Sequence, residues 1–292
     1  MTISAIVRVS GLVLLGGVTC ALVFTSIAHA PSKITKKVSV MSPSPTPSLA
    51  LPLDTLSGQA IYVLDTTNGR ILGAKNAQYR FSAASTTKLM SILVASSYFK
   101  FTDTIVASHA GTEGVMIGLK PGDRLTFEHA LYAMLLPSAN DVAQAVADNY
   151  PGGKPAFIQA MNDKARELHL ERTTFADPAG LEDDSGYTTA QELTHIASVF
   201  VENKAIAHIA SIQSATIPVD GIGMVKLVNT NLLLGYKGIN GLKTGTTEGA
   251  KEVLVTSLPL RGHTIIITVM KSDDRFADTK TIVDYLEKHY LN

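Results

Sequence analysis

The chain has 292 residues, of which 46% are hydrophobic and 17% charged, and its 25 basic residues balance its 25 acidic ones. This composition excludes a disordered protein, because such chains bury too little apolar surface to fold. The balanced charge also lacks the basic footprint of a nucleic-acid partner, so we expect no nucleic acid to bind.

The first 30 residues differ in composition from the rest of the chain. Arg8 is their single charged side chain, and an apolar run follows from Val9 to Ala28. Because about 20 apolar residues span a bilayer, we expect residues 1–30 to be a signal peptide or an N-terminal membrane anchor. Ala28-His29-Ala30 resembles a signal-peptidase site, but Pro31 after it disfavours cleavage. We therefore favour the anchor.

A linker is expected between this segment and the folded part. Residues 31–52 include Ser-Pro-Ser-Pro-Thr-Pro at 42–47, which is typical of a partly extended tether. Cys20, the single cysteine of the chain, lies in the apolar run. The folded part therefore has no cysteine and forms no disulfide. Residues 53–292 are enough for one well-buried domain or two small ones.

A β-hairpin is expected to open the folded part. Residues 58–64 and 70–73 are rich in strand-forming side chains and flank Asn68-Gly69, a strong turn pair. The turn fixes which residues of the two strands pair, so the segment from 58 to 73 is predicted to form two adjacent antiparallel strands.

A buried helix is predicted next. The segment from Leu89 to Ala95 is hydrophobic on nearly every side, as in a helix at the middle of a domain. Ser85 lies at the start of this helix. Lys88 follows one turn later and is expected on the same face.

Helices are predicted through the middle of the chain. The first follows Thr126 and ends at Leu136, before Pro137. The next two cover 141–148 and 155–170, and a fourth follows a capping box of Thr189 and Glu192. Ser138 and Asn140 are expected on the connection between the first two of these helices.

Strands return near the end of the chain. Lys243-Thr244-Gly245 is expected to end one strand, with further strands at 253–257 and 263–269 and a final helix at about 276–290. Strands at both ends of the chain with helices between them predict one antiparallel sheet that contains both termini and is covered by helices.

Three short motifs carry the chemistry: Ser85-Thr86-Thr87-Lys88, Ser138-Ala139-Asn140 and Lys243-Thr244-Gly245. Each of them alone arises by chance in chains of this length. Their joint occurrence in this order is typical of serine acyl-transfer enzymes that act on D-alanyl peptides or penicillins.

The nucleophilic serine needs a base to remove its proton. None of the eight histidines falls in a motif, so we expect no catalytic histidine. Lys88 is the better base, because it follows Ser85 by three residues among apolar neighbours. It acts only when neutral, a state that burial and a second cation such as Lys243 favour by lowering its pKa.

The other two motifs supply polar groups for a peptide substrate. Ser138 offers a hydroxyl that can relay a proton, and Asn140 an amide that can hold a peptide backbone, although this pattern alone is also typical of a capped turn. Lys243-Thr244-Gly245-Thr246 offers a cation, two hydroxyls and a glycine that lets substrate approach the backbone. A ligand with a free carboxylate fits best. We expect no cofactor and no metal.

Longer stretches around these motifs resemble a known family, the low-molecular-mass penicillin-binding proteins that act as serine D-alanyl-D-alanine carboxypeptidases. They are Ala60-Ile61-Tyr62-Val63-Leu64-Asp65, Ala84-Ser85-Thr86-Thr87-Lys88-Leu89-Met90, Leu135-Leu136-Pro137-Ser138-Ala139-Asn140-Asp141, Phe175-Ala176-Asp177-Pro178-Ala179-Gly180-Leu181 and Gly241-Leu242-Lys243-Thr244-Gly245. The resemblance runs from about Ala60 to the C-terminus. It implies a β-lactamase/transpeptidase-like α/β (α+β) fold with an all-helical subregion, in a catalytic domain at 53–292.

The resemblance also implies roles for the residues of the first two motifs. Ser85 would be the acylated nucleophile and Lys88 its base. Ser138 would relay a proton to the leaving D-alanine, and Asn140 would bind the substrate amide.

The third motif would bind substrate. The resemblance assigns the terminal carboxylate to Lys243, Thr244 and Thr246, with Gly245 between them. It assigns the oxyanion hole to the backbone N–H groups of Ser85 and Thr246.

The implied reaction removes the terminal D-alanine from peptidoglycan stem peptides and tailors cell-wall cross-linking. The implied partners are a stem peptide ending in D-Ala-D-Ala, β-lactams as inhibitors, and the membrane through the N-terminal segment. Lys33, Lys36 and Lys37 after the apolar run would be cytoplasmic by the positive-inside rule. The implied substrate lies outside the cytoplasm, and we give this argument precedence over the positive-inside rule. We therefore expect the protein on the extracytoplasmic face of the membrane or exported to the periplasm or cell wall.

The chain departs from the family pattern at four positions. Ala139 replaces a usual glycine, Asp177 a common asparagine, Lys251 a common glycine and Val253 a frequent cysteine. None of these changes removes a catalytic group, although Lys251 is expected to change the rim of the site. We expect the protein to lack the all-β C-terminal domain and membrane tail of many members, and the N-terminal anchor to replace that tail.

Three alternatives remain open. A DD-endopeptidase uses the same motifs. A class A-like β-lactamase would need a second carboxylate to activate water, for which Glu182, Asp183 and Asp184 are candidates. A non-catalytic penicillin-binding sensor would lack a catalytic group, whereas all of them are present.

Overall fold

The computed structural model describes residues 49–111, 113–181 and 185–290. The chain divides into two units, residues 1–44 and 45–292, and all described residues belong to the second. The expected signal peptide or anchor at 1–30 and most of the expected linker therefore lie outside the described residues. Within the described part of the chain, no helix has both the length and the apolar composition needed to cross a bilayer.

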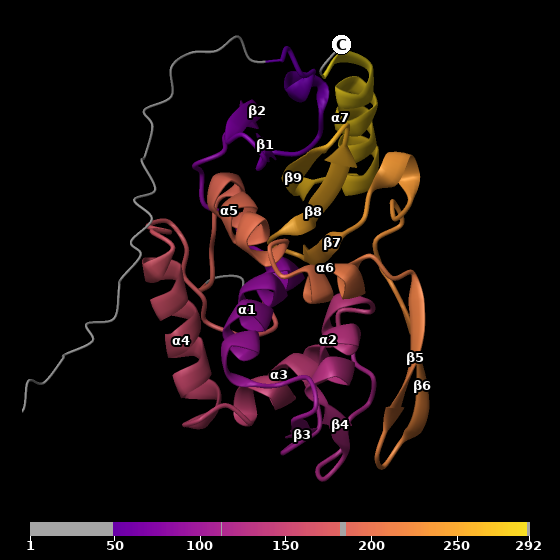
Figure 1. Ribbon diagram of the computed structural model, residues 1–292. Helices are drawn as coiled ribbons and strands as arrows, with labels where there is room; N and C mark the ends of the chain where they lie inside the picture. The colour runs from indigo at the N-terminus through magenta and orange to yellow at the C-terminus, as the bar shows by residue number, and fades with distance from the viewer. Residues whose placement is uncertain (1–48, 112, 182–184, 291–292) are drawn as a thin grey trace, which may run out of the picture. The chain divides into compact units, whose positions relative to one another are not determined.

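A five-stranded antiparallel sheet combines strands from both ends of the described chain, in the order β2-β1-β9-β8-β7 (Figure 1). Its strands are β1 (Ala60–Asp65), β2 (Arg70–Lys75), β7 (Leu242–Thr247), β8 (Lys251–Leu260) and β9 (His263–Ser272). The predicted N-terminal hairpin and the predicted pairing of both chain ends are confirmed. β1 pairs with β9, and β7 forms one edge of the sheet.

Helices and two small ribbons make up the rest of the described structure. The helices are α1 (Lys88–Tyr98), α2 (Phe127–Leu135), α3 (Asn140–Asp148), α4 (Gly153–Glu167), α5 (Ala190–Phe200), α6 (Lys204–Ala210) and α7 (Arg275–His289), with short 3-10 turns η1 (Leu53–Thr55), η2 (Ala84–Thr87) and η3 (Tyr236–Gly238). The ribbons are β3 (Thr104–Val106) with β4 (Arg124–Thr126), and β5 (Ser214–Val219) with β6 (Gly223–Val228).

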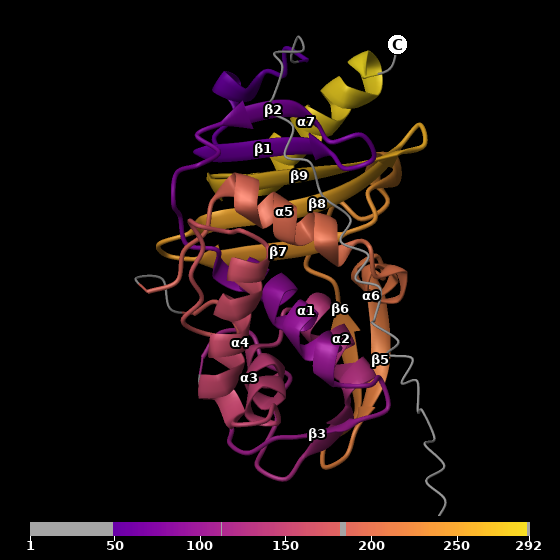
Figure 2. The same cartoon turned by 60° about the vertical axis from the view of Figure 1, so that its left-hand side comes forward.

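The alternation of side chains along the strands produces two separate cores. Ala60 and Tyr62 of β1 face the core that contains α5, whereas Ile61 and Val63 face the core that contains α7. Figure 2 shows α5 and α7 on opposite faces of the sheet. Each fully buried aliphatic side chain contributes about 1.5–3 kcal/mol through removal from water, so both faces hold the sheet firmly.

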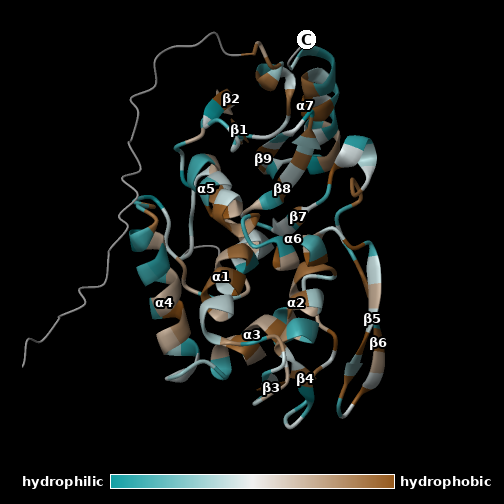
Figure 3. Ribbon diagram, in the orientation of Figure 1, coloured by the Kyte–Doolittle hydropathy of each residue, from teal (hydrophilic) through white to brown (hydrophobic). Residues whose placement is uncertain are grey.

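The helices α1 to α4 form the predicted all-helical region next to the β7 edge. Helix α1 lies at its centre, and Leu89, Met90 and Ile92 are completely buried. Figure 3 shows apolar residues along α1 and α3, whereas α4 carries many hydrophilic ones. The segment from Leu89 to Ala95 is apolar on nearly every side because α1 is packed against other elements on all its sides.

Several predicted boundaries were wrong. The Lys243 motif lies near the start of β7 and does not end it. Asn140 is the first residue of α3 and does not lie on the connection. Thr189 caps α5 as predicted, but the Glu192 carboxylate binds the N–H of Arg172 instead of completing the capping box. Helix α6 and the β3–β4 and β5–β6 ribbons were not predicted.

Candidate active site

Ser85 lies in the short turn η2, which leads directly into α1. Ala84 before it has a positive φ of 46°, a conformation that costs energy outside glycine. Two glycines make room for this turn. A Cβ atom at Gly180 would collide with the carbonyl of Ala84, and one at Gly245 would lie 3.1 Å from the nitrogen of Ser85. The glycine of the third motif therefore lets β7 pack against the serine turn, a function that the sequence analysis did not identify.

Lys88 is completely buried and makes three hydrogen bonds. Its Nζ donates to Ser85 Oγ at 3.0 Å, to Asn140 Oδ1 at 2.7 Å and to the carbonyl of Ala179 at 2.8 Å. A neutral amine has two N–H groups and one lone pair. The amide oxygen of Asn140 and the carbonyl of Ala179 can only accept, whereas Ser85 also carries a proton. When Lys88 is neutral, its lone pair therefore faces the hydroxyl of Ser85.

Burial lowers the pKa of Lys88 to about 7, against the opposing attraction of Asp177 and Asp141. Both burial and Lys243 were expected to lower this pKa. Burial is the main cause, and repulsion between the two amines instead contributes to the lowered pKa of Lys243. The effect of the two carboxylates was not anticipated, because only tertiary packing brings α3 and the turn at residues 177–181 against Lys88.

Asp141 and Asp177 each hold a loop beside Lys88. The carboxylate of Asp141 accepts hydrogen bonds from backbone N–H groups of residues 117–119, and that of Asp177 from those of residues 179–181. Hydrogen bonds to Gln144 and to these N–H groups lower the pKa of Asp177 despite its burial. The aspartate at 177 thus fixes the turn whose Ala179 carbonyl contacts Lys88.

The second motif forms the opposite wall of the site. Ser138 has a φ of 72°, and its Oγ is buried with no hydrogen-bond partner among the described residues. The Asn140 side chain accepts from Lys88 and donates to the carbonyl of Glu113 at 3.1 Å. Asn140 therefore joins the second motif to Lys88, and Ser138, two residues earlier, has a buried hydroxyl with no partner among the described residues.

The third motif lies on the edge strand β7. Lys243 is 1% exposed, and burial together with the charges of Lys88 and Arg275 lowers its pKa well below the usual value. Thr244 is buried, whereas Thr246 is exposed. A ligand carboxylate beside Lys243 would raise the pKa of this lysine, against the effects of burial and of the neighbouring cations. Lys243 would then regain its positive charge.

Arg275 belongs to the same edge and was missed by the sequence analysis. It begins α7, and its Nη1 donates to the carbonyl of Gly245 at 2.7 Å and to Thr246 Oγ1 at 2.5 Å. No motif marks it, because its position depends on the pairing of β7, β8 and β9. Lys251, expected at the rim, starts β8 and pairs with Asp273 at 2.7 Å.

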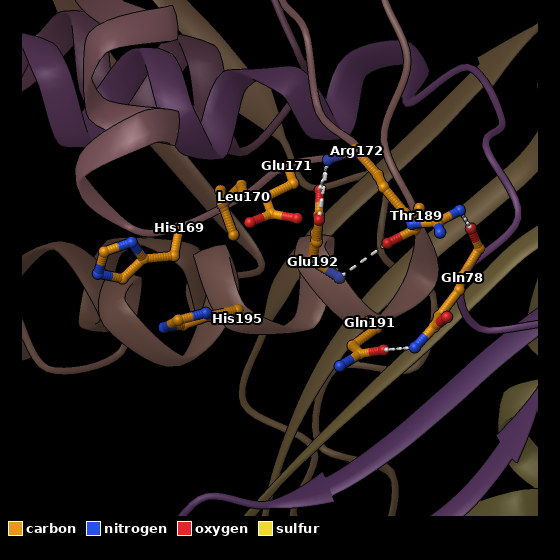
Figure 4. A pocket seen from close by; sticks show the side chains of 9 residues that line it. All are labelled: Gln78, His169, Leu170, Glu171, Arg172, Thr189, Gln191, Glu192 and His195. Atoms are coloured by element: carbon orange, nitrogen blue, oxygen red, sulfur yellow. Dashed lines mark hydrogen bonds between the residues drawn. The ribbon is translucent and has the colours of Figure 1, made fainter. Parts of the chain in front are cut away.

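The histidines lie apart from this cluster, as far as the described residues are concerned. His169 and His195 line a separate pocket of about 230 Å³ at the start of α5, shown in Figure 4, which contains no motif residue. Glu182, Asp183 and Asp184, the candidate carboxylates of a β-lactamase, lie outside the described residues. The described part of the chain contains no group of three or more acidic, histidine or cysteine side chains suited to a metal.

Comparisons with known proteins agree with this arrangement. Residues 46–274 match the model of the D-alanyl-D-alanine carboxypeptidase family of peptidases. The chain is 32% identical over 264 residues to the D-alanyl-D-alanine carboxypeptidase of Streptomyces sp. strain K15, covering 82% of this chain and 90% of that protein. It is 28% identical over 239 residues to D-alanyl-D-alanine carboxypeptidase DacF of Bacillus subtilis, and spans 61% of that longer protein.

The fold has a solved counterpart. The crystal structure of the Streptomyces K15 DD-transpeptidase superimposes with a TM-score of 0.73 at 28% identity, covering 84% of this chain and 98% of that one. The predicted fold class, a sheet from both chain ends with a helical region, is therefore confirmed.

Proposed function

The chain belongs to the D-alanyl-D-alanine carboxypeptidase family of serine peptidases, and from this premise we propose how its site works. The reaction is hydrolysis of the terminal D-alanine of a peptidoglycan stem peptide through an acyl-enzyme on Ser85. One observation carries this proposal: the buried Lys88 donates to two groups that can only accept and to one serine hydroxyl, at 3.0 Å.

In the acylation step, neutral Lys88 takes the proton of Ser85 while Oγ attacks the carbonyl of the penultimate D-alanine. The bond to the terminal D-alanine breaks, and its nitrogen receives a proton. Ser138 is suited to this relay, because its buried Oγ has no other partner among the described residues. Water then hydrolyses the ester and returns Ser85.

Negative charge on the attacked oxygen needs preorganised donors. The N–H of Ser85 belongs to the first turn of η2, where helical donors have no partner within the helix. β7 is an edge strand, which leaves outward N–H groups for a substrate. We therefore assign the oxyanion hole to the N–H groups of Ser85 and Thr246.

The terminal carboxylate of the substrate is proposed to bind between Lys243, Thr244, Thr246 and Arg275. Arg275 adds a permanent charge, held next to Thr246 Oγ1. Asn140, whose amide contacts Lys88, is proposed to bind the peptide backbone in exchange for its bond to Glu113. These contacts favour peptides that end in a free carboxylate.

The experiment that tests this function uses two substrates with the soluble fragment 53–292. A pentapeptide ending in D-Ala-D-Ala is expected to release free D-alanine, measured by an enzymatic D-alanine assay. A cross-linked dimer of stem peptides is the competing substrate. Release of monomer from the dimer without D-alanine from the pentapeptide would contradict the proposal and favour a DD-endopeptidase. Release of neither product would favour a non-catalytic sensor.

Members of this family act on the cell wall, outside the cytoplasm. We propose that this protein is held at the outer face of the membrane by its N-terminal segment, because the run from Val9 to Ala28 is long enough to span a bilayer. After cell fractionation, native protein is expected in the membrane with an N-terminus near Met1. A soluble protein beginning at Pro31 would contradict this anchor and indicate a cleaved signal peptide.

A further inference from the structure

A second hydroxyl contacts the proposed carboxylate site from the segment that follows β6. Thr230 Oγ1 lies 2.6 Å from Thr244 Oγ1. The backbone N–H of Thr230 donates to the carbonyl of Leu136 at 3.0 Å, and its Oγ1 lies 3.3 Å from the same oxygen. Leu136 stands two residues before Ser138. Thr230 therefore joins the strand of the third motif to the loop of the second.

Two buried asparagines hold Thr230 in place. Asn229 Nδ2 donates to the carbonyl of Ile212 at 2.9 Å, and its Oδ1 accepts from the N–H of Asn231 at 2.9 Å. Asn231 Nδ2 donates to the carbonyl of Gly241 at the start of the β7 segment at 3.3 Å. Both asparagines are less than 10% exposed, at 8% and 4%. This network leaves Thr230 little freedom to move away from Thr244.

The direction of the proton between the two threonines decides what Thr244 offers to a ligand. If Thr230 donates to Thr244, the proton of Thr244 is free to donate to a carboxylate. If Thr244 donates to Thr230, Thr230 donates to Leu136, and Thr244 presents only lone pairs that repel an anion. In the first arrangement Thr230 donates its proton to Thr244 across 2.6 Å and gives up the longer, weaker hydrogen bond of 3.3 Å to the carbonyl of Leu136. An anionic ligand selects this arrangement.

We propose that Thr230 is a positioning residue that directs the hydroxyl proton of Thr244 toward the substrate carboxylate and so sets the selectivity for peptides with a free C-terminus. This inference rests on the proposed carboxylate site of the third motif. Thr230 itself acts through Thr244 and not on the reacting atoms.

The test compares Thr230→Val with wild type on two peptides, one ending in D-Ala-D-Ala and the other in its C-terminal amide. For the free acid, kcat/KM is expected to fall about tenfold, mostly through KM, as loss of a hydrogen bond to a charged group predicts. For the amide, whose carbonyl oxygen is only a neutral acceptor, the loss is expected to be smaller, about twofold to threefold.

Two further variants separate positioning from structural damage. Thr230→Ser keeps the hydroxyl and is expected to restore the KM for the free acid. In a Thr244→Val background, Thr230→Val is expected to add no further loss, because the two residues act as one unit. Thermal unfolding of each variant checks the fold.

Equal losses on both peptides would indicate a merely structural role and overturn the inference, as would a Thr230→Val variant equal to wild type on the free acid. If wild type releases neither D-alanine from the free acid nor D-alaninamide from the amide, the proposed function fails separately. Thr230→Val and wild type are then compared by their rates of Ser85 acylation. Thr230→Val is expected to be acylated more slowly by penicillin, which has a free carboxylate, and as fast as wild type by the penicillin methyl ester.

Discussion

A Ser85→Ala variant is expected to form no covalent adduct with penicillin, whereas wild type gains the mass of one. Ser85 Oγ is the hydroxyl held by Lys88 Nζ at 3.0 Å, at the start of the buried helix α1. Alanine removes the nucleophile without adding volume to a tightly packed turn. Intact-protein mass spectrometry measures the loss, and peptide mapping of wild type locates the adduct.

Ser97→Ala is a matched control for this result. Ser97 lies on the same helix, and its Oγ donates to the carbonyl of Val94, one turn earlier, so its removal leaves the cleft unchanged. This variant is expected to be acylated as wild type is. An adduct that survives in Ser85→Ala would show that another residue is the nucleophile.

The lifetime of the same adduct separates a peptidase from a β-lactamase. A stem peptide loses D-alanine on acylation, which opens space for water, whereas the leaving nitrogen of a penicillin stays tethered and blocks it. Without a dedicated deacylating carboxylate the adduct is expected to persist for minutes or longer, while pentapeptide is turned over steadily. Rapid penicillin turnover that Glu182→Gln abolishes would instead favour the β-lactamase.

The sequence predicted the elements whose signals are local. Asn68-Gly69 marked the first hairpin, and the unbroken apolar run after Lys88 marked a helix buried on all sides. The strands at both chain ends also predicted a shared sheet, although not the pairing of β1 with β9. The β5–β6 ribbon escaped prediction because its outward positions carry apolar side chains, including Met224 and Val228, which remove the usual alternation.

Of the candidate catalytic cluster, only the residues within the three short motifs were predicted. Ser85, Lys88, Ser138 and Asn140 were expected together; Lys88 contacts Ser85 and Asn140, whereas the place of Ser138 in the reaction stays a prediction. Other groups that adjust the cluster depend on packing: Arg275 reaches β7 and Thr230 reaches Thr244 from elsewhere in the chain, and the effect of Asp141 and Asp177 on Lys88 appears only in the folded structure. A charge or hydroxyl placed by tertiary contacts carries no local pattern that a sequence can display.

Lys88→Arg is expected to slow acylation of Ser85 roughly a thousandfold, within the range for loss of a general base. The guanidinium stays protonated at any working pH, so it has no lone pair for the proton of Ser85. Stopped-flow acylation by a chromogenic β-lactam measures the rate. Because arginine is larger than the buried lysine, thermal unfolding and the neutral variant Lys88→Met, which is expected to lose acylation equally, guard against a folding defect.

The pH profile identifies the base. Lys88 has a folded pKa of about 7, and its neutral form is the active one. The wild-type acylation rate is therefore expected to rise with pH, about tenfold per unit below pH 7, and to level off above it. In Lys88→Arg this inflection disappears. In Lys243→Arg, a permanent neighbouring charge disfavours protonated Lys88, so the inflection remains but moves to lower pH. An inflection that persists in Lys88→Arg and vanishes in Lys243→Arg would transfer the base role to Lys243.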